Sequence, residues 1–354
     1  MVIKHLKKII KNKINNQFID VFDGQNKEWI ELENIILFGP YGIPITSNFK
    51  IIYSSMGTIG FAKIRLRYTI KEYGLVRIVF ELIKVKVFNF NLIKSTSGLL
   101  IPRAGLPGLP NYGHYLCEDL PKIKIYKEWE NKNNSKLKLI LGPYPERKWL
   151  NQFLKLFDYN KDELIINKKL FLKVSTLVMA KLYYIHAFSF QSNPNGIKWV
   201  GDTLKNKILK GEEVERANIF IDRRKVYRRH VTNYNDLIPL LKKYNFITVD
   251  PEDYSVEEQI KLFSAAKIIS GPSGAAFANM IFAKNAIIIN SYFILNKMNC
   301  WENLSLDMGF KYIPVRTNAV IRNQKPDHFQ DLEIDIKHFE NILASISPTT
   351  INSN

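Results

Sequence analysis

The sequence predicts an α/β protein with two domains, and three observations support this fold class. The chain has 354 residues, more than one ordinary domain needs, and this length suits two domains of about 150 residues each. Its hydrophobic content of 46% is sufficient for two buried cores. From Asn218 to Asn290, predicted strands and helices alternate without interruption, which is typical of parallel βαβ units.

The predicted boundaries divide the chain into four parts. Residues 1–20 form a terminal helix, and residues 21–205 form an N-terminal α/β domain with additional antiparallel strands. A second α/β domain spans residues 206–325, and residues 326–354 form a closing helix and tail. A polar run with proline and glycine at residues 191–196 is predicted to belong to the hinge region between the domains.

The first segment has the pattern of a basic amphipathic helix. One helical face carries the apolar residues Ile3, Leu6, Ile10 and Ile14, and the other faces carry Lys4, Lys7, Lys8 and Lys11. Such a terminal helix either lies on an anionic membrane surface or packs its apolar face on the protein body.

Residues 28–93 show the alternation expected of β-structure. Apolar and polar residues alternate from Lys63 to Ile70 and apolar residues recur at every second position from Val76 to Leu82, on either side of Gly74. A period of two indicates a strand. The pattern therefore predicts an antiparallel hairpin with one solvent-exposed face.

Helices and strands alternate again in residues 95–180. The predicted strands span residues 99–101, 137–141 and 174–179. Within this region, one predicted helix begins at Asn111 and another spans residues 146–157. Two more are predicted outside it, at residues 199–209 before the C-terminal domain and at residues 334–346 as a closing helix. This alternation predicts a second α/β layer in the N-terminal domain.

Charge and cysteine content restrict the function classes. Lys and Arg total 51 against 33 Asp and Glu, a net charge of +18, which favours polyanions, anionic lipids or a phosphate-bearing substrate. Cys117 and Cys300 match no metal spacing and indicate a reducing compartment. No apolar run approaches the roughly 20 residues that span a bilayer, and no signal-peptide core is evident, so a soluble or peripheral protein is expected.

The stretch from Gly271 to Gly274 is the leading candidate for ligand binding. It is predicted to form a tight turn between an apolar strand at residues 267–270 and a helix, and a second apolar strand follows at residues 286–290. Ligands of parallel sheets bind beyond the carboxyl ends of the strands, where a glycine turn lets phosphate reach backbone N–H groups. The turn is therefore predicted to face an anionic ligand.

The residues around this turn resemble the C-terminal half of glycosyltransferase family 61. The resemblance covers residues 218–290 and includes arginines after the first strand, an asparagine that opens the next helix, and a Gly-x-x-Gly-Ala turn followed by an asparagine. The matching residues are Arg223, Arg224, Arg228, Arg229, Asn233, Phe246, Pro251-Glu252, Glu258-Gln259, Gly271, Ser273, Gly274, Ala275 and Asn279. Ser273 stands where eukaryotic members of the family have a histidine, which puts the role of that histidine in doubt.

The resemblance implies two Rossmann-like domains that face a cleft, the arrangement called GT-B. Residues 206–325 would bind a nucleotide-sugar donor, and residues 21–205 would bind the acceptor. It further implies an inverting glycosyltransferase that transfers sugar to a glycan or lipid-linked acceptor in surface (capsular) polysaccharide biosynthesis. Such an enzyme is expected in the cytoplasm, peripheral to the inner face of the plasma membrane.

His114 is the candidate catalytic base. On the predicted helix, Glu118 follows at i+4 on the same face, and Asp119 lies one position further round. A carboxylate beside an imidazole fixes its tautomer and raises its basicity, which the deprotonation of a sugar hydroxyl requires. The family has a similar histidine a few residues before an aspartate and Leu-Pro. A capping or packing role for His114 stays open, and so does the choice of base among the three residues.

A basic cluster follows the strand predicted at residues 219–221. It contains Arg223, Arg224, Lys225, Arg228 and Arg229. Because it emerges at the same sheet edge as the glycine turn, its guanidinium groups are predicted to bind a leaving diphosphate. Arginines and helix N-termini can replace a metal ion in this role, and the sequence has no Asp-x-Asp motif. We therefore expect no metal and no cofactor.

Three further residues complete the predicted donor site with Gly274. Gln259 and Asn279 flank the turn on two predicted helices, where each either contacts the donor or caps and packs locally. The hydroxyl group of Ser273 can donate to a phosphate.

Two other functions were weighed against glycosyl transfer. A serine hydrolase with Ser273 as nucleophile requires a Gly-x-Ser-x-Gly elbow, but Gly274 follows the serine directly. A nucleic-acid binder is consistent with the charge of +18, but the sequence contains no recognised nucleic-acid-binding module. We expect no nucleic-acid partner.

Overall fold

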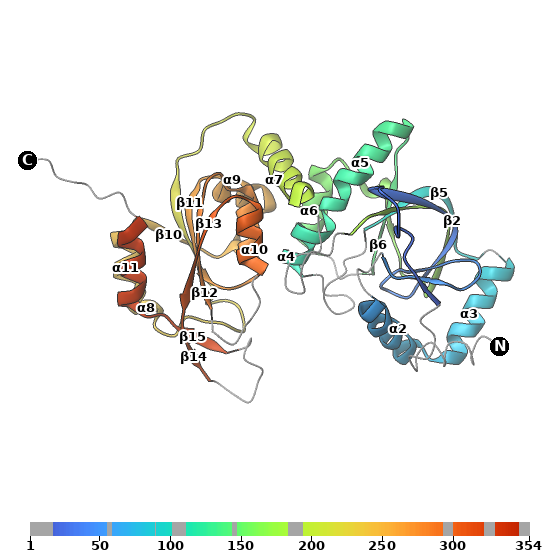
Figure 1. Ribbon diagram of the computed structural model, residues 1–354, viewed down its shortest axis with the longest axis horizontal. Coiled ribbons are helices and arrows are strands. Elements are labelled where there is room, and N and C mark those ends of the chain that lie inside the picture. Colours follow the sequence, from blue (N-terminus) through green and yellow to red (C-terminus); the bar gives the residue numbers. More distant parts are fainter. Residues whose placement is uncertain are drawn as a thin grey trace, which may run out of the picture. The chain divides into compact units, whose positions relative to one another are not determined.

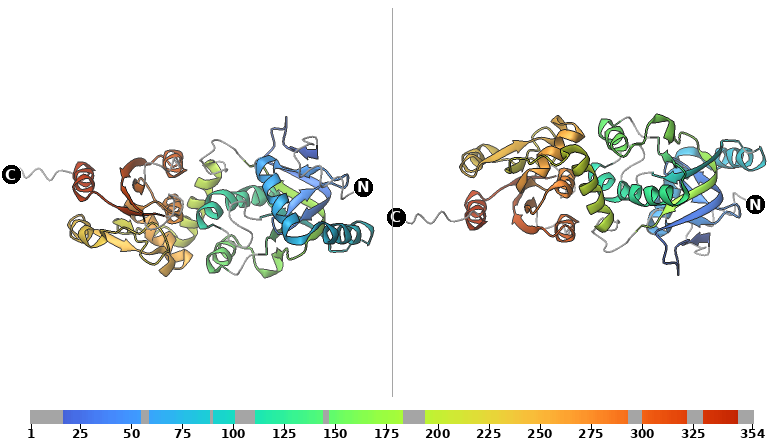
Figure 2. Two further views of the ribbon diagram at one scale, coloured as in Figure 1. Left: turned by 90° about the horizontal axis from the view of Figure 1, so that it is seen from below. Right: turned by 90° about the horizontal axis from the view of Figure 1, so that it is seen from above.

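A computed structural model of the chain describes residues 17–54, 59–88, 90–100, 111–143, 147–182, 194–292, 300–321 and 330–346. The chain divides into two compact units, residues 1–186 with 190–200 and residues 187–189 with 201–354 (Figures 1 and 2). Each unit contains helices packed on a β-sheet. The predicted α/β class is therefore confirmed.

The first unit contains an eight-stranded mixed sheet. The strand order is β1-β4-β3-β2-β8-β5-β6-β7. The strands are β1 (Phe18–Ile19), β2 (Trp29–Phe38), β3 (Ile43–Ile45), β4 (Ile51–Ile52), β5 (Leu92–Leu99), β6 (Lys138–Leu141), β7 (Leu164–Ile166) and β8 (Phe171–Ala180). β2 is antiparallel to both β3 and β8, whereas β8, β5, β6 and β7 are parallel to one another.

The helices of the first unit come mainly from its middle. They are α2 (Ile59–Tyr73), α3 (Leu75–Phe88), α4 (Tyr112–His114), the π-helical turn η3 (Tyr115–Asp119), α5 (Pro121–Asn133), α6 (Lys148–Leu156), the 3-10 turn η4 (Lys161–Glu163) and α7 (Pro194–Leu209). The division between the units falls within α7, at residues 200 and 201. Residues 194–196, predicted as part of a hinge region, form the first turn of α7, and residues 191–193 lie outside the described residues.

The hairpin predicted around Gly74 is wrong, because these residues form α2 and α3 (Figures 1 and 2). The same apolar residues also fit a helical period. Ile78, Leu82 and Val85 recur at i, i+4 and i+7 and are buried in one core with β2 and β3. Gly74 has a φ of 72° and its N–H donates to the Ile70 carbonyl oxygen, so it terminates α2.

The opposite face of α3 presents apolar side chains to solvent. Val76 is 79% exposed, Phe80 60% and Val87 64%, and they fall on one stripe of the helix together with Ile83. A helix that is apolar on nearly all sides is usually buried. The exposure of this apolar stripe in the described part of the chain is therefore unusual.

Three other N-terminal predictions differ from the structure. Most of the helix predicted for residues 1–20 lies outside the described residues, but Phe18 and Ile19 form β1, parallel to β4. The strand predicted at residues 99–101 is the end of β5, which begins at Leu92. The antiparallel strands of this unit are β2, β3, β4 and β8 rather than the predicted hairpin.

Three other elements of this unit are confirmed. β6 and β8 are the strands predicted at residues 137–141 and 174–179, and α6 is the helix predicted at residues 146–157.

The second unit contains a five-stranded sheet that is entirely parallel. Its strand order is β10-β9-β11-β12-β13. The strands are β9 (Ala217–Ile221), β10 (Phe246–Val249), β11 (Ala266–Pro272), β12 (Ile287–Tyr292) and β13 (Lys311–Arg316). The edge strand β13 was not predicted, because its sequence KYIPVR contains a proline and mixes charged with apolar residues.

Helices cover both faces of this sheet (Figure 1). They are α8 (Tyr234–Lys243), the 3-10 turn η5 (Pro251–Asp253), α9 (Val256–Ser264), the 3-10 helix η6 (Ala275–Phe282), α10 (Cys300–Asp307) and α11 (Ile336–Ile346). α8 and α11 pack on one face around Leu237, Phe339 and Leu343. The predicted closing helix is thus part of this core. A two-stranded sheet of β14 (Asn318–Val320) and β15 (Asp331–Glu333) completes the unit.

Candidate active site

The carboxyl ends of β9 and β11 form the switch point of the second sheet. β9 and β11 are neighbours, and the strands that follow them in the chain, β10 and β12, pair on their outer sides. Ligands of doubly wound sheets bind in the crevice beyond such a point. Arg223 lies just after β9, and Ser273 and Gly274 follow β11 directly. The structure therefore brings the basic cluster and the glycine turn to one edge.

The turn is shorter than predicted. Gly271 and Pro272 belong to β11, where they pair in register with Asn290 and Ser291 of β12. Only Ser273 and Gly274 connect β11 to η6. The strand is longer than expected because β12 continues to Tyr292 and offers further backbone partners.

Glycine is required at position 271 for the close approach of β11 to β9. Gly271 has a φ of 140°, a conformation that L-residues rarely adopt. A Cβ atom here would come within 2.7 Å of the Ile221 carbonyl oxygen. The glycine thus permits the two strands to carry their ends to the same crevice.

Two guanidinium groups meet the turn from the β9 side. Arg229 Nη1 donates a hydrogen bond of 2.6 Å to the carbonyl oxygen of Ser273. A Cβ atom on Gly274 would overlap Nη1 of Arg223, so the glycine leaves room for this side chain. Arg229 also has a φ of 60°, a strained conformation for a residue with a side chain. The backbone strain and the contact together fix the position of this guanidinium.

The charges of these two arginines are poorly compensated. Burial, together with the charge of Arg228, lowers the pKa of Arg223 to about 10. Burial and the charges of Arg223 and Arg228 lower the pKa of Arg229 to about 9. Neither side chain forms an ion pair with a carboxylate of the described residues. Since the folded protein disfavours these charges, a bound anion would offset the cost.

Arg224 and Lys225 interact with carboxylates instead. Arg224 Nε donates to Asp222 Oδ2 at 2.7 Å, and its guanidinium lies 4.2 Å from the centre of the Tyr234 ring. Lys225 Nζ lies 2.6 Å from Asp253 Oδ2. These two residues of the basic cluster hold the loop in place, and they are not among the groups that meet the turn.

Arg228 lies beside Arg223 and Arg229. Its carbonyl oxygen is 3.5 Å from Arg223 Nη2, and its guanidinium lies 5.2 Å from the centre of the Tyr227 ring. The side chain is half-buried, and its charge acts on both neighbouring arginines. Arg228 therefore contributes to the positive potential at this edge.

Gln259 and Asn279 contact each other. Asn279 Nδ2 donates to Gln259 Oε1 at 3.0 Å, and Gln259 Nε2 donates to the Tyr254 carbonyl oxygen at 3.1 Å. Both residues are buried, Asn279 completely. The pair links α9 to η6. Of the two predicted roles, donor contact or local packing, this hydrogen bond favours packing.

Two buried hydroxyl groups at the same edge were not predicted. Ser270 directly follows the isoleucines of β11, Ser291 lies two residues after those of β12, and both are fully buried. Within the described part of the chain, neither Oγ atom has a hydrogen-bond partner. The Ser291 carbonyl oxygen accepts from the Ser273 N–H at 2.9 Å, so Ser291 contacts the turn directly. A serine one or two residues after a run of isoleucines is the signal that could have found both.

His114 lies in the first unit, next to a change of helix type. The Asn111 side chain caps α4 by accepting from the N–H groups of Gly113 and His114. The π-helical turn η3 follows, and Pro121 then occupies the first turn of α5. Since proline has no N–H to donate, the regular hydrogen-bond ladder is interrupted here. π-Helical turns are frequent at functional sites.

The structure brings His114 and Glu118 together. His114 Nδ1 lies 3.1 Å from Glu118 Oε2. The imidazole is 36% exposed, whereas the carboxylate is 2% exposed. A buried carboxylate at Nδ1 favours a proton on that nitrogen and leaves Nε2 as the basic atom. This is the arrangement that general-base catalysis requires.

Asp119 has a different partner. Asp119 Oδ1 lies 2.6 Å from Lys122 Nζ, and both residues are buried. Burial, and to a lesser extent the Asp119 charge, raises the pKa of the neighbouring Tyr115 well above its ordinary value. The buried ion pair with Lys122 makes Asp119 a structural group of this turn, and the sequence did not reveal Lys122 as its partner.

The described residues contain neither a cluster of metal ligands nor a membrane-spanning helix. Within these ranges, no three His, Cys, Asp or Glu side chains gather closely enough to hold a metal ion. No helix in the described part of the chain is both long and apolar enough to cross a bilayer.

The fold and the cationic edge define an α/β protein with a candidate anion site, and comparison with known families makes the assignment more specific. A family model described as Glycosyltransferase 61 matches residues 112–289, half of the chain. The chain belongs to this family. The match begins on α4, two residues before His114, and ends within β12, so it includes both candidate sites. No curated protein matches the sequence.

Membership of this family implies glycosyltransferase activity. Neither a serine hydrolase nor a nucleic-acid-binding protein is supported by it.

Proposed function

We propose that the protein is an inverting glycosyltransferase that moves a sugar from a nucleotide-sugar donor to a glycan or lipid-linked acceptor. One observation carries the proposal. In a chain of glycosyltransferase family 61, two half-buried arginines without a carboxylate partner in the described residues, each with a buried Nε atom, lie at the switch point of a parallel sheet. That position and that charge suit the diphosphate of the donor.

Arg223 and Arg229 would bind the diphosphate and stabilise the charge that develops as it leaves. Two guanidinium groups present planar, paired donors that match phosphate oxygens. Because they are already fixed in place, little reorganisation is needed in the transition state. In this proposal no metal ion or cofactor is required, since the arginines neutralise the leaving group.

His114 would act as the base in a single displacement. Its Nε2 atom takes the proton of the acceptor hydroxyl, and the acceptor oxygen forms a bond to the anomeric carbon of the donor sugar. The bond between that carbon and the diphosphate oxygen breaks, and the electron pair leaves with the nucleoside diphosphate. Glu118 would position His114 and stabilise the imidazolium that forms.

The proposal includes the arrangement called GT-B. In it, the second unit binds the donor and the first unit binds the acceptor. The biological setting is the synthesis of capsular or other surface polysaccharide at the inner face of the plasma membrane.

A panel of nucleotide sugars and free nucleotides tests the proposal. We expect one nucleoside diphosphate and its sugar conjugates to raise the melting temperature of the purified protein by several degrees, because a ligand that binds only the folded state stabilises it. The same conjugate should be turned over with a suitable acceptor, and EDTA should not reduce the rate. If no nucleotide shifts the melting temperature, the proposed donor site is wrong.

The exposed stripe of α3 supports a second part of the proposal, contact with an anionic membrane. Val76, Phe80 and Val87 are more than half exposed on one face. Residues 59–88 carry seven lysines and arginines against two glutamates. An apolar helical stripe within a basic segment is typical of helices that lie in a membrane interface. A lipid-linked acceptor would require the enzyme to reach such a surface.

Vesicle sedimentation tests this contact. Wild-type protein should bind vesicles that contain phosphatidylglycerol and bind phosphatidylcholine vesicles weakly. Phe80→Ser with Val87→Ser should reduce binding by about tenfold or more, because two exposed apolar side chains no longer enter the interface. Leu306→Ser, a matched change at a residue that is 64% exposed on α10, should leave binding unchanged. Unchanged binding of the double variant, or a dimer in solution that the double variant dissociates, would rule out membrane docking by α3.

A further inference from the structure

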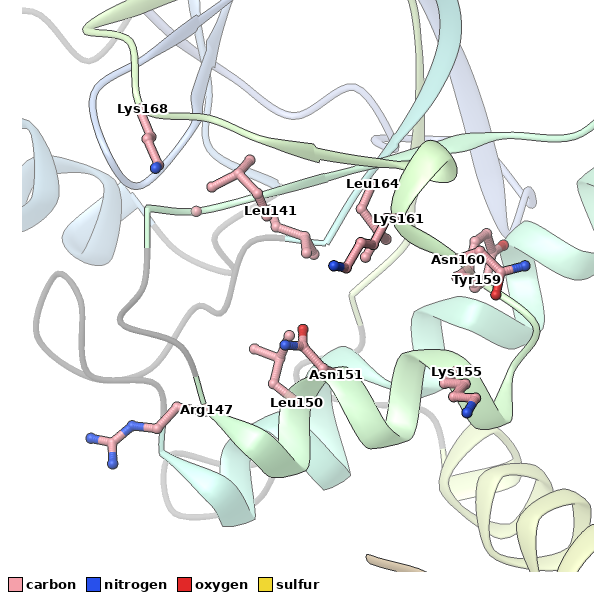
Figure 3. A pocket seen from close by; sticks show the side chains of 12 residues that line it. Leu141, Arg147, Leu150, Asn151, Lys155, Tyr159, Asn160, Lys161, Leu164 and Lys168 are labelled. Carbon is pink, nitrogen blue, oxygen red and sulfur yellow. The ribbon is translucent and has the colours of Figure 1, made fainter.

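A cavity lies in the first unit, at the carboxyl ends of β6 and β7 (Figure 3). Its volume is about 600 Å³, which falls within the usual range for ligand pockets. It is enclosed by the ends of these strands, by α6 and by the segment of η4. The lining residues are Leu141, Gly142, Arg147, Leu150, Asn151, Lys155, Tyr159, Asn160, Lys161, Leu164, Ile166 and Lys168.

The polar side chains that line this pocket are all cationic or neutral. Four basic side chains line it, namely Arg147, Lys155, Lys161 and Lys168, and the lining contains no aspartate or glutamate. None of the four forms an ion pair with a carboxylate of the described residues. Figure 3 shows Lys161 extending into the middle of the pocket, above Asn151 of α6. The pocket therefore attracts an anion.

The walls of the pocket are apolar. Leu141 and Leu150 are buried, but Ile166 is 46% exposed at the end of β7. Leu164 and Tyr159 add further apolar surface. A free inorganic anion would make no use of such walls, since removing apolar surface from water requires an apolar ligand.

We propose that this pocket binds a lipid phosphate, meaning a phosphate or diphosphate group attached to a single hydrocarbon chain. The chain would lie against Leu164 and Ile166, and the phosphate would be held by Lys161 and Lys168. This inference rests on the proposed glycosyltransferase function, because it identifies the lipid-linked substrate as the acceptor and assigns its anchor to the first unit. It also separates the acceptor anchor from the arginine site of the second unit.

Calorimetry with decyl phosphate, below its micelle concentration, tests the pocket. Wild-type protein should bind decyl phosphate at least tenfold more tightly than inorganic phosphate or the uncharged decyl maltoside. Octyl phosphate should bind roughly tenfold more weakly than decyl phosphate, since each buried methylene contributes to affinity. Equal binding of decyl phosphate and inorganic phosphate would show an anion site without a lipid chain and would overturn the proposal.

Matched variants locate the binding site. Lys161→Glu with Lys168→Glu should weaken decyl phosphate binding at least tenfold, whereas Lys148→Glu with Lys169→Glu, at exposed lysines that do not line the pocket, should not. Ile166→Ser should also weaken binding, and Ile247→Ser, at a residue that is 43% exposed in the second unit, should not. Equal effects of the pocket and control variants would overturn the proposal.

Two further measurements separate the alternatives. Short-chain phosphatidic acid, which carries two acyl chains, should bind more weakly than decyl phosphate; equal binding would assign the pocket to bulk phospholipid and not to an acceptor. Binding of the nucleoside diphosphate should be unchanged in Lys161→Glu with Lys168→Glu. If decyl phosphate binds but no nucleotide does, the pocket stands and the proposed donor site fails; the reverse result leaves the donor site and removes the pocket.

Discussion

Arg229→Ala is expected to weaken binding of the donor's nucleoside diphosphate about 100-fold, a loss of roughly 3 kcal/mol. The guanidinium is half-buried near Arg223 and donates to the Ser273 carbonyl oxygen. A diphosphate in the crevice would compensate the charges of Arg229 and Arg223. Removing the Arg229 guanidinium would therefore cost the diphosphate at least two charge-assisted hydrogen bonds. Calorimetric titration of the purified variant measures the effect, and Arg223→Ala should behave in the same way.

Two variants control for this result. Lys225→Ala changes a cation in the same loop, but Lys225 is exposed and paired with Asp253, so affinity should change little. Arg229→Lys keeps the charge but loses the planar pair of donors, and its affinity should be intermediate. Both Arg229 variants should remain folded, because no buried carboxylate loses its partner. Affinity in Arg229→Ala equal to that of wild type would contradict the proposed donor site.

Most of the C-terminal sheet was predictable because four of its five strands contain short apolar runs. β11 contains Ile268-Ile269 and β12 contains Ile287 to Ile289, each followed by small or polar residues, a pattern typical of strands buried on both faces. Neighbouring parallel strands also carry their ends to the same edge, so the sequence order alone placed the basic cluster beside the glycine turn. The extension of β11 to Pro272 was not predictable, since it depends on pairing with β12.

The segment around Gly74 shows why a local pattern can fail. Residues 59–88 fit a period of two and a helical period equally well, because apolar side chains occur on both faces of α3. The exposed stripe that made the segment look like a strand is the same stripe that we assign to the membrane. The exposed apolar side chains thus obscured the helical period.

The site residues were predicted as a group but could not be distinguished individually. Arg224 and Arg229 look equivalent in sequence, yet Arg224 is bonded to Asp222 and Arg229 meets the turn. The difference arises from the left-handed backbone at Arg229, which no local residue pattern demands. The mutual hydrogen bond of Gln259 and Asn279 depends equally on the packing of α9 against η6.

His114→Ala is expected to reduce kcat by a factor of about 10²–10⁴ without changing the affinity for the nucleoside diphosphate. The imidazole is partly exposed, and its Nδ1 atom faces the buried carboxylate of Glu118. Its loss would leave the acceptor hydroxyl without a base, whereas the donor residues belong to the second unit. Steady-state kinetics with the donor found in the nucleotide panel, together with calorimetry, separates the two quantities.

The roles of the neighbouring carboxylates can be separated by the same measurements. Glu118→Gln should lower kcat about tenfold, because the imidazolium that forms during the reaction loses a compensating charge. Asp119→Asn should instead reduce the free energy of unfolding by several kcal/mol, since it leaves the buried ammonium of Lys122 without its partner. His338→Ala, at an exposed histidine of α11, serves as the matched control and should retain wild-type turnover. If His114→Ala also retains it, His114 is not the base, and the change of helix type at η3 has only a structural role.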